Sequence, residues 1–389
     1  MEALNLTVAL LVLGAMTYSP KANANQELDL NLPELTSGIK HYEVGEYQAA
    51  IEIYNQAIKI NPQDASCYFY RGLARFELGD NQGAIADYNQ AVDINPQDAL
   101  IYLHRGNVYF ELGDRELALA DYDRALNINP LIATALINRG VAYFELGDNE
   151  LAIANYDQAL NIAANDVLGY LNRGNARLQL GDNKGAIADY NQALHLNPNL
   201  EQGYNNLGAA RLLLGNSLGA VADFQQALLI NPQSTAAYNN QGAARLQRGD
   251  YQAAIGDFQQ ALLINPQSAA AYNNQGAARL QLGDPDGAIA DFKQALLINP
   301  NLAKAHYNQG AARLLLGQHH RAIADFTSSL EINPNLATAH FKRGFCYYLV
   351  EDTSKAQADF LQAAELFEQQ GRISDSHLAL DILKELRDR

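Results

Sequence analysis

The sequence has few cysteines and no basic cluster. Only two of its 389 residues are cysteine, Cys67 and Cys346, and no run is rich in lysine or arginine. The formal net charge is -16, from 27 basic and 43 acidic residues. Because a protein that binds phosphate backbones needs a clustered basic face, we do not expect a nucleic-acid partner.

The sequence also lacks the short motifs of common enzyme classes. It has no glycine-rich phosphate loop, no nucleophile elbow and no zinc-binding motif. The adjacent pair His319 and His320 has no third ligand at a fixed spacing, which argues against a metal site. We therefore predict a non-enzymatic protein with no catalytic residues, no cofactor and no metal.

An apolar run extends from Leu4 to Met16 and is short for a helix that spans a bilayer. It precedes a small-residue site, Ala22-Asn23-Ala24. This pattern predicts a signal peptide over residues 1–24, a linker over 25–30, and export to a periplasm or thylakoid lumen. The start of the chain carries Glu2 and no basic residue, so two alternatives stay open: an uncleaved membrane anchor and a misassigned start codon. We expect membrane contact only if this segment stays uncleaved.

The chain does contain a regular repeat with a period of 34 residues. Proline marks it, with Ala164 at the one missing position, and the prolines are Pro62, Pro96, Pro130, Pro198, Pro232, Pro266, Pro300 and Pro334. Such a period is typical of a solenoid of two-helix repeats, each burying its apolar face against its neighbours. With proline as position 32, ten repeats cover residues 31–370, and they start at Asn31, Ala65, Ala99, Ala133, Val167, Glu201, Thr235, Ala269, Ala303 and Ala337.

Four positions of the repeat predict how its two helices pack and turn. Position 8 is glycine and position 20 is alanine in all ten repeats, and position 24 is always aromatic. Regular glycine inside a helix indicates close approach by a partner helix, and the aromatic ring is expected to fill the remaining space. Glycine at position 15, from Gly45 through Gly317, predicts the end of the first helix. The Asp or Asn that usually follows predicts the N-cap of the second helix.

This arrangement resembles the tetratricopeptide repeat (TPR) family. The family pattern at positions 4, 8, 20, 24, 27 and 32 is matched by Tyr238, Gly242, Ala254, Phe258, Ala261 and Pro266. The resemblance implies an all-α fold, a right-handed superhelical solenoid of ten helix-turn-helix repeats. The terminal repeats depart from the pattern, with Glu34 at the aromatic position and Glu351 and Glu368 at the glycine and proline positions, as expected of capping repeats.

The end of the chain is expected to cover the last repeat. The second helix of repeat 10 should end at Gln370, before Gly371. Residues 371–389 are then predicted to form a capping helix that begins after an N-cap at Ser374 and faces the core with Leu378, Ile382 and Leu386.

A periodic set of arginines and aspartates could be mistaken for a catalytic constellation. Position 23 is Asp in eight repeats, with Ile53 and Asn155 as the exceptions, and repeats 2–10 each have arginine at position 7 or 11. Positions 7 and 11 share the face turned toward the second helix, where a guanidinium must be paired. We therefore predict a buried or half-buried salt-bridge ladder without a functional role.

The two cysteines are separated by seven complete repeats. A rod-like solenoid keeps such residues too far apart for a disulfide, so we expect two small buried side chains. An intermolecular bridge through an exposed Cys67 stays open as an alternative.

The opposite stripe of the first helix, at positions 2, 5, 6, 9, 12 and 13, should form one continuous concave wall. We predict a peptide-binding groove on it, made by asparagine at position 6 (Asn138, Asn172, Asn206, Asn240, Asn274, Asn308), asparagine at position 5 (Asn205, Asn239, Asn273) and leucine at position 12 (Leu212, Leu246, Leu280, Leu314). A primary amide donates and accepts, so these amides can pair with the main chain of an extended peptide. This ladder looks like that of the O-linked N-acetylglucosamine transferases. The alternative is that the amides bond to the backbone of a neighbouring repeat.

Repeats 1–5 have a more aromatic wall, suited to bulky anchors: Phe69, Tyr70, Phe76, Leu103, His104, Phe110 and Phe144. The leading hypothesis is an exported scaffold that holds an extended segment of another protein. The style of the repeats resembles TPR proteins of photosynthetic bacteria, which implies a role in assembling envelope or thylakoid complexes. A cytosolic adaptor that controls a partner enzyme and a self-associating rod are the alternatives.

Overall fold

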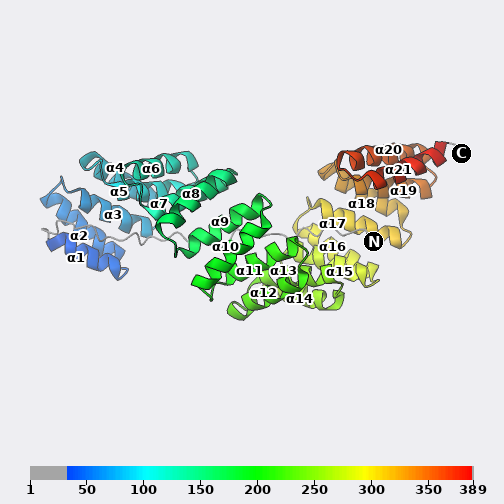
Figure 1. The fold of residues 1–389 in the computed structure, drawn as a ribbon, viewed down its shortest axis with the longest axis horizontal. Coiled ribbons are helices and arrows are strands. Elements are labelled where there is room, and N and C mark those ends of the chain that lie inside the picture. The colour runs from blue at the N-terminus through cyan, green and yellow to red at the C-terminus, as the bar shows by residue number, and fades with distance from the viewer. Residues whose placement is uncertain (1–32, 388–389) are drawn as a thin grey trace. The chain divides into compact units, whose positions relative to one another are not determined.

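The computed structural model describes residues 33–387, which contain 21 helices and no strand (Figure 1). The predicted signal peptide and linker lie outside these residues. The described residues fall into two compact units, 33–203 and 204–387, here called the N-unit and the C-unit. The expected all-α class is confirmed.

The helices follow one another in pairs. The N-unit contains α1 (Pro33–Glu43), α2 (Tyr47–Ile60), α3 (Ala65–Glu77), α4 (Asn81–Ile94), α5 (Ala99–Glu111), α6 (Arg115–Ile128), α7 (Ala133–Glu145), α8 (Asn149–Ile162), α9 (Val167–Gln179) and α10 (Asn183–Leu196). The C-unit is built from α11 (Glu201–Leu213), α12 (Ser217–Ile230), α13 (Thr235–Arg248), α14 (Tyr251–Ile264), α15 (Ala269–Gln281), α16 (Pro285–Ile298), α17 (Ala303–Leu315), α18 (His319–Ile332), α19 (Ala337–Leu349), α20 (Thr353–Gln369) and α21 (Ile373–Arg387). Odd-numbered helices up to α19 are the first helices of the ten repeats, and even-numbered helices are the second helices.

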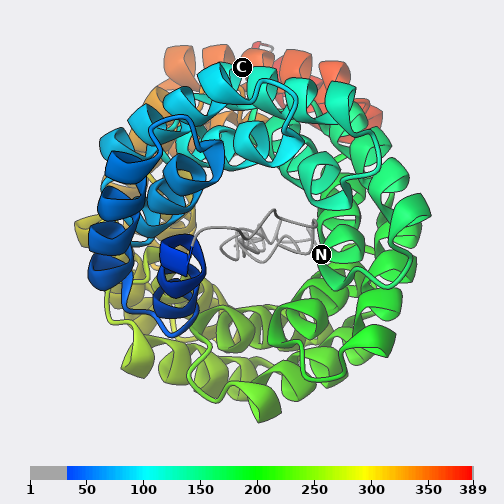
Figure 2. The same cartoon turned by 90° about the vertical axis from the view of Figure 1, so that its left-hand side faces the viewer.

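Each unit has two layers of helices, visible end-on in Figure 2. Within each unit, a second helix packs against the first helix of its own repeat and against the first helix of the next, as α4 packs against α3 and α5 and α14 against α13 and α15. Consecutive first helices also contact each other, as in α5–α7 and α13–α15, whereas consecutive second helices within the described residues do not do so to a comparable extent. Because the first helices lie closer together, each unit curves with its first helices on the concave side.

Glycine at position 15 forms the turn between the helices, as predicted. In repeats 1–9 its φ is positive, from 70° at Gly317 to 89° at Gly113. Only a residue without a Cβ adopts this left-handed region at little cost. In repeat 10 Glu351 takes the same conformation, with φ of 63°.

The predicted N-caps form in only some repeats. Asp80 accepts a hydrogen bond from the backbone N–H of Gly83 at 2.9 Å, and similar caps are made by Asp182, Asn216, Asp284 and Asp352. Asp114, Asp148 and Asp250 make no side-chain cap. In four of the five capped repeats the third helical residue is glycine, and a Cβ at Gly83 would lie 2.0 Å from the Asp80 carboxylate. The cap prediction was therefore wrong for repeats 3, 4 and 7, where the third helical residue is Leu117, Leu151 or Ala253, although Asp352 caps its helix with Lys355 there.

The predicted contact between position 8 and position 24 is confirmed. A Cβ at Gly242 would lie 2.6 Å from Cε1 of Phe258, and one at Gly174 would lie 2.6 Å from Cε1 of Tyr190. All ten position-24 rings are at most 1% exposed. The glycine thus provides the space in which the ring is buried.

The last helix differs from its prediction at two points. It begins at Ile373, so Ser374 lies inside it and is not the N-cap. Leu378 is 52% exposed, and the core contacts come from Leu383 and Leu386, which cluster with Phe360 of α20. The predictions for Ile382, which packs against this cluster, and for Leu386 are therefore confirmed, and the prediction for Leu378 was wrong.

Candidate functional site

The arginine and aspartate ladder connects the two helices of each repeat, as predicted. In α3, the Arg71 Nε donates to Asp87 at 2.9 Å and Arg75 Nη1 donates to the same carboxylate at 2.8 Å. In the C-unit, Arg245 Nη1 donates to Asp257 at 2.7 Å. The position-23 aspartates are all buried, so each charge is paired inside the fold.

The arginine at position 7 also joins neighbouring repeats, which the sequence did not suggest. Arg71 Nη1 donates to Oδ1 of Asn55, at position 25 of the preceding repeat, at 2.6 Å. The same link is made by Arg105 to Asn89, Arg139 to Asp123, Arg173 to Asp157 and Arg343 to Thr327. These arginines therefore hold consecutive repeats together as well as the helices of one repeat.

Repeats 6–9 have no arginine at position 7, and the pKa values of their position-23 aspartates are raised. Burial raises the pKa values of Asp223, Asp257, Asp291 and Asp325 to about 6, although the position-11 arginine of each repeat partly offsets this. In repeat 10, burial of Asp359 is outweighed by hydrogen bonds from Arg343 and His340, which lower its pKa. The difference follows from the number of donors that each carboxylate receives.

The asparagines predicted to line the groove form hydrogen bonds between repeats. Three position-6 amides donate to the position-5 amide oxygen of the preceding repeat, and the bonds join Asn240 to Asn205 (3.0 Å), Asn274 to Asn239 (3.2 Å) and Asn308 to Asn273 (3.1 Å). These side chains, and Asn206, are less than 10% exposed. The alternative, a bond to the backbone of a neighbouring repeat, is right about the neighbouring repeat and wrong about the partner, which is a side-chain amide. Peptide contact by these residues remains a prediction.

In the N-unit the asparagine side chains have other hydrogen-bond partners. Asn138 donates to Oδ1 of Asn107 at 2.9 Å, and the Tyr122 hydroxyl donates to the same oxygen at 2.9 Å. Tyr190 makes the equivalent bond to Asn175. The sequence signal for this link was the joint occurrence of asparagine at position 9 and tyrosine at position 24. Asn172 is 9% exposed, and position 9 of the preceding repeat is Val141, which has no amide.

The leucines predicted for the groove differ in exposure. Leu212 and Leu246 are 4% and 6% exposed and belong to the core, whereas Leu280 and Leu314 are half-buried. Half-buried alanines, Ala236 and Ala270, stand at position 2. The surface available in the C-unit therefore consists of the two ends of the first helices, with the amides beneath it.

The aromatic residues predicted for the N-unit wall also divide into core and surface. Tyr70, Leu103 and His104 are buried, and burial lowers the pKa of His104 to about 4. The rings of Phe69 and His104 lie edge to face, with their centroids 5.3 Å apart. The residues that keep exposed surface are the half-buried Phe69, Phe76, Phe110 and Phe144.

The described residues contain no group of three His, Cys, Asp or Glu side chains that could hold a metal ion. Both cysteines are free and buried, as expected, and burial raises the pKa of Cys67 to about 12 and that of Cys346 to about 11. Such thiols stay protonated and are poor nucleophiles. No helix within residues 33–387 combines the length and apolarity needed to cross a membrane.

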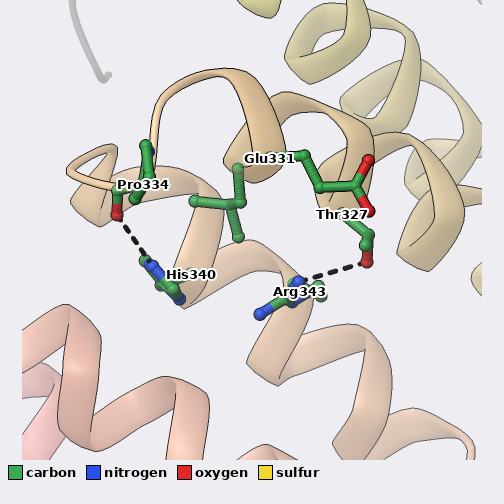
Figure 3. A pocket seen from close by; sticks show the side chains of 6 residues that line it. Thr327, Glu331, Pro334, His340 and Arg343 are labelled. Carbon is green, nitrogen blue, oxygen red and sulfur yellow. Dashed lines mark hydrogen bonds between the residues drawn. The ribbon is translucent and has the colours of Figure 1, made fainter.

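A cavity of about 260 Å³ lies between α18 and α19 (Figure 3). His340 and Arg343 face Thr327 and Glu331 across it, and Leu330 and Pro334 complete its lining. Its polar groups already bond to one another: Arg343 donates to Thr327 at 3.1 Å, and His340 lies 3.1 Å from the Pro334 carbonyl. It is smaller than a typical small-molecule site, and its donors are occupied.

Models of known protein families match this chain along repeats 1–9. Models described as TPR repeat or tetratricopeptide repeat match residues 38–79, 72–113, 106–147, 140–181, 174–215, 201–234, 235–268, 269–302 and 303–336. The chain belongs to the tetratricopeptide repeat family. TPR proteins bind proteins or peptides and are generally non-enzymatic, so the chain is a protein-interaction scaffold.

Solved TPR structures share this fold. A tetratricopeptide repeat protein from Parabacteroides merdae superposes with a TM-score of 0.55 at 22% identity, over 64% of this chain and 99% of that one. A chain of the APC/C hetero-tetramer Cut9–Hcn1 superposes with a TM-score of 0.55 at 19% identity, over 80% of this chain and 75% of that one. No curated protein matches this chain.

Proposed function

We propose that this TPR protein holds an extended segment of a partner protein against the concave side of its C-unit. The surface that binds is the first-helix wall, defined here as positions 2, 5, 6, 9, 12 and 13 of α11, α13, α15 and α17. The observation that carries the proposal is how few charges this wall has, since Lys304 of α17 is its one charged residue. In repeats 6–8 these positions hold only Ala, Asn, Gln and Leu, although the whole chain has a net charge of -16.

A wall with a single charged residue suits an apolar or neutral segment. A charged side chain on a concave surface repels segments of like charge and must be desolvated when any segment binds. The wall avoids both costs in repeats 6–8, while Leu280 and Leu314 at its half-buried end offer apolar contact. The paired amides beneath keep the first helices in register, so the wall is formed before the partner arrives.

The test places two negative charges in the wall without disturbing the amides. Ala236 and Ala270 are half-buried second residues of α13 and α15, where glutamate favours the helix N-terminus. We expect Ala236→Glu with Ala270→Glu to abolish partner capture in a pull-down from the native host while the melting temperature stays unchanged.

The matched control changes the same residue type on the other layer. Ala222 and Ala290 are exposed residues of the second helices α12 and α16. Ala222→Glu with Ala290→Glu adds the same charge and should leave capture unchanged. Equal capture by both double variants would contradict the groove proposal.

We further propose that the protein is exported and acts in assembly of an envelope or thylakoid complex. The apolar run before Ala24 and the style of the repeats support this extension. A mature N-terminus at Asn25, read by mass spectrometry from an exported fraction, is the expected result. An intact N-terminus in the cytosolic fraction would instead favour the regulatory adaptor.

A further inference from the structure

The outer layer of the C-unit carries a row of exposed leucines. Position 29, near the end of each second helix, is leucine in repeats 6–8, and Leu229, Leu263 and Leu297 are 73%, 74% and 75% exposed. In the other seven repeats the same position is exposed and polar, namely Lys59, Asp93, Asn127, Asn161, His195, Glu331 and Glu365. Single exposed leucines are common, but a row of three at one position of the repeat indicates an interaction surface.

The residues around these leucines carry almost no charge. The exposed positions 25 and 26 of α12, α14 and α16 hold glutamine, except for Lys293. Position 22 holds Ala222, Gly256 and Ala290. Because positions 22, 25, 26 and 29 are three or four residues apart, they share one side of each helix. These positions of the three helices are called the outer leucine face here.

Gly256 lies on the middle helix of this face, at a point that the rest of the unit leaves open. A Cβ at Gly256 would have no neighbour within 4 Å among the described residues. Position 22 is alanine in eight repeats and glutamate in the first, so glycine occurs there once. Glycine inside a helix lowers the stability of that helix. A glycine that no contact within the chain requires indicates close approach by a second molecule.

The curvature of the C-unit gives the position of this glycine a purpose. The second helices lie on the convex side, so a second molecule on the outer leucine face meets α14 before it meets α12 or α16. A larger side chain at position 22 of α14 would hold that molecule away from Leu229 and Leu297. With glycine there, the leucines of all three helices are covered together.

We propose that the outer leucine face binds a second copy of this chain. In a two-fold arrangement α14 lies on α14 of the other copy and α12 lies on α16, so Leu263 meets Leu263 and Leu229 meets Leu297. Two copies that each carry a net charge of -16 repel each other, and a face with almost no charge lets them meet at the least cost. The same arrangement places the two Lys293 side chains at opposite ends of the contact.

This contact does not depend on the groove proposal, because the groove is on the first helices and the outer leucine face is on the second helices. Ala222→Glu with Ala290→Glu should weaken self-association and leave partner capture unchanged. Self-association that this variant leaves intact would contradict the contact between copies, whereas lost capture would contradict the groove.

Sedimentation velocity of the full chain, over a series of concentrations, measures the association. We expect the parent chain to pass from monomer to dimer as its concentration rises. Leu263→Glu places a charge against its own copy and should raise the dissociation constant at least about tenfold. Leu131→Glu, at a 69% exposed leucine of the N-unit, adds the same charge and should change it by less than about twofold. A parent chain that stays monomeric, or equal effects of the two variants, would overturn the proposal.

Gly256→Leu separates close approach of the two helices from general hydrophobic association. The variant adds apolar surface but holds the two α14 helices apart, so it should raise the dissociation constant at least about tenfold. Ala188→Leu, at the exposed position 22 of α10 in the N-unit, adds similar apolar surface and should have an effect of less than about twofold. Stronger association of the Gly256→Leu chain would overturn the proposal.

A bismaleimide crosslinker tests which helices meet. Chains with Leu263→Cys should crosslink to each other, whereas chains with Leu297→Cys should crosslink only after they are mixed with Leu229→Cys chains. The native thiols of Cys67 and Cys346 are buried and do not compete for the reagent. Crosslinking of Leu297→Cys chains to each other as efficiently as Leu263→Cys chains would overturn the two-fold arrangement.

Discussion

The side-chain amide of Asn240 donates a hydrogen bond to the amide oxygen of Asn205 at 3.0 Å, across the boundary between two repeats. Both residues are buried, at 2% and 6% exposure. The bond recurs in the next two repeats, so a feature that resembles a peptide-binding ladder also holds the first helices in register.

Removing one amide of this ladder should destabilise the C-unit. In Asn240→Ala the oxygen of Asn205 loses its donor while it stays buried, and we expect a loss of about 1–2 kcal/mol in the free energy of unfolding. Gln260→Ala, on the exposed face of α14, is the control and should change stability by less than about 0.5 kcal/mol. Urea unfolding measures both. Equal stability of Asn240→Ala and the parent chain would show that the amides do not stabilise the fold.

Two buried tyrosines at position 24 should respond oppositely to loss of their hydroxyl. Tyr122 donates to Asn107, so Tyr122→Phe leaves that amide with one donor fewer and should cost about 1 kcal/mol. The hydroxyl of Tyr54 is buried without a hydrogen-bond partner among the described residues, so Tyr54→Phe should be neutral or stabilising. Thermal melts of the two variants check this. A larger loss for Tyr54→Phe would contradict the hydrogen-bond assignment.

Glu351 should be less favourable than glycine in its turn. Its φ of 63° lies in the left-handed region, where a side chain costs about 1–2 kcal/mol. Glu351→Gly should therefore raise stability by about 1 kcal/mol after the entropy that glycine adds to the unfolded chain. The reverse exchange, Gly317→Glu, should lower stability by a similar amount or more. A destabilised Glu351→Gly chain, seen in urea unfolding, would argue for a stabilising contact of the Glu351 side chain.

The stability of the C-unit should increase as the pH falls from 7 to 5. The four position-23 aspartates of repeats 6–9 have native pKa values of about 6, above the value of about 3.9 in an unfolded chain. Between these values the native state binds protons that the unfolded state does not. Protonation of these aspartates therefore stabilises the native state, fully below the unfolded pKa, and this stabilisation is lost as the pH rises through 6. Between pH 7 and 5 we expect the free energy of unfolding to rise by about 1 kcal/mol per aspartate.

Asp257→Asn should reduce that gain by about 1 kcal/mol, because one titrating group is removed. The exposed Asp250 provides the control, since Asp250→Asn should leave the gain unchanged. Urea unfolding at pH 7 and 5 with constant ionic strength measures it. Asp359 has a lowered pKa, so its ionised carboxylate stabilises the native state, and this stabilisation is lost only as the pH falls further. Falling stability between pH 7 and 5 would contradict the account.

The contacts that could be predicted from the sequence are those between two positions of the same repeat. Gly242 and Phe258 recur in register, so close packing could be inferred without coordinates, and the same holds for the pairing of Arg245 with Asp257. Contacts between repeats could not be inferred so directly. The bond from Asn240 to Asn205 and the one from Arg71 to Asn55 depend on how far one repeat is rotated against the next, and side-chain stacking decides that rotation.

The sequence pattern also overestimated the exposed part of the groove. Leu212 and Leu246 share position 12 with the half-buried Leu280 and Leu314, yet they are buried. Leu212 packs with Val221 and Phe224, and Leu246 packs with Ile255 and Phe258. Periodicity identifies a face of a helix, but the neighbouring side chains decide how much of that face solvent reaches.

Photo-crosslinking at two positions tests the central claim, that the first-helix wall of the C-unit holds a partner segment. A benzophenone amino acid replaces Ala270 on the wall or Ala290 on the outer layer, and crosslinked products are identified by mass spectrometry in the native host. The account predicts that position 270 captures one defined stretch of a single partner, and that Ala236→Glu removes this product. Equal capture from position 290, or capture at 270 that Ala236→Glu leaves unchanged, would contradict it.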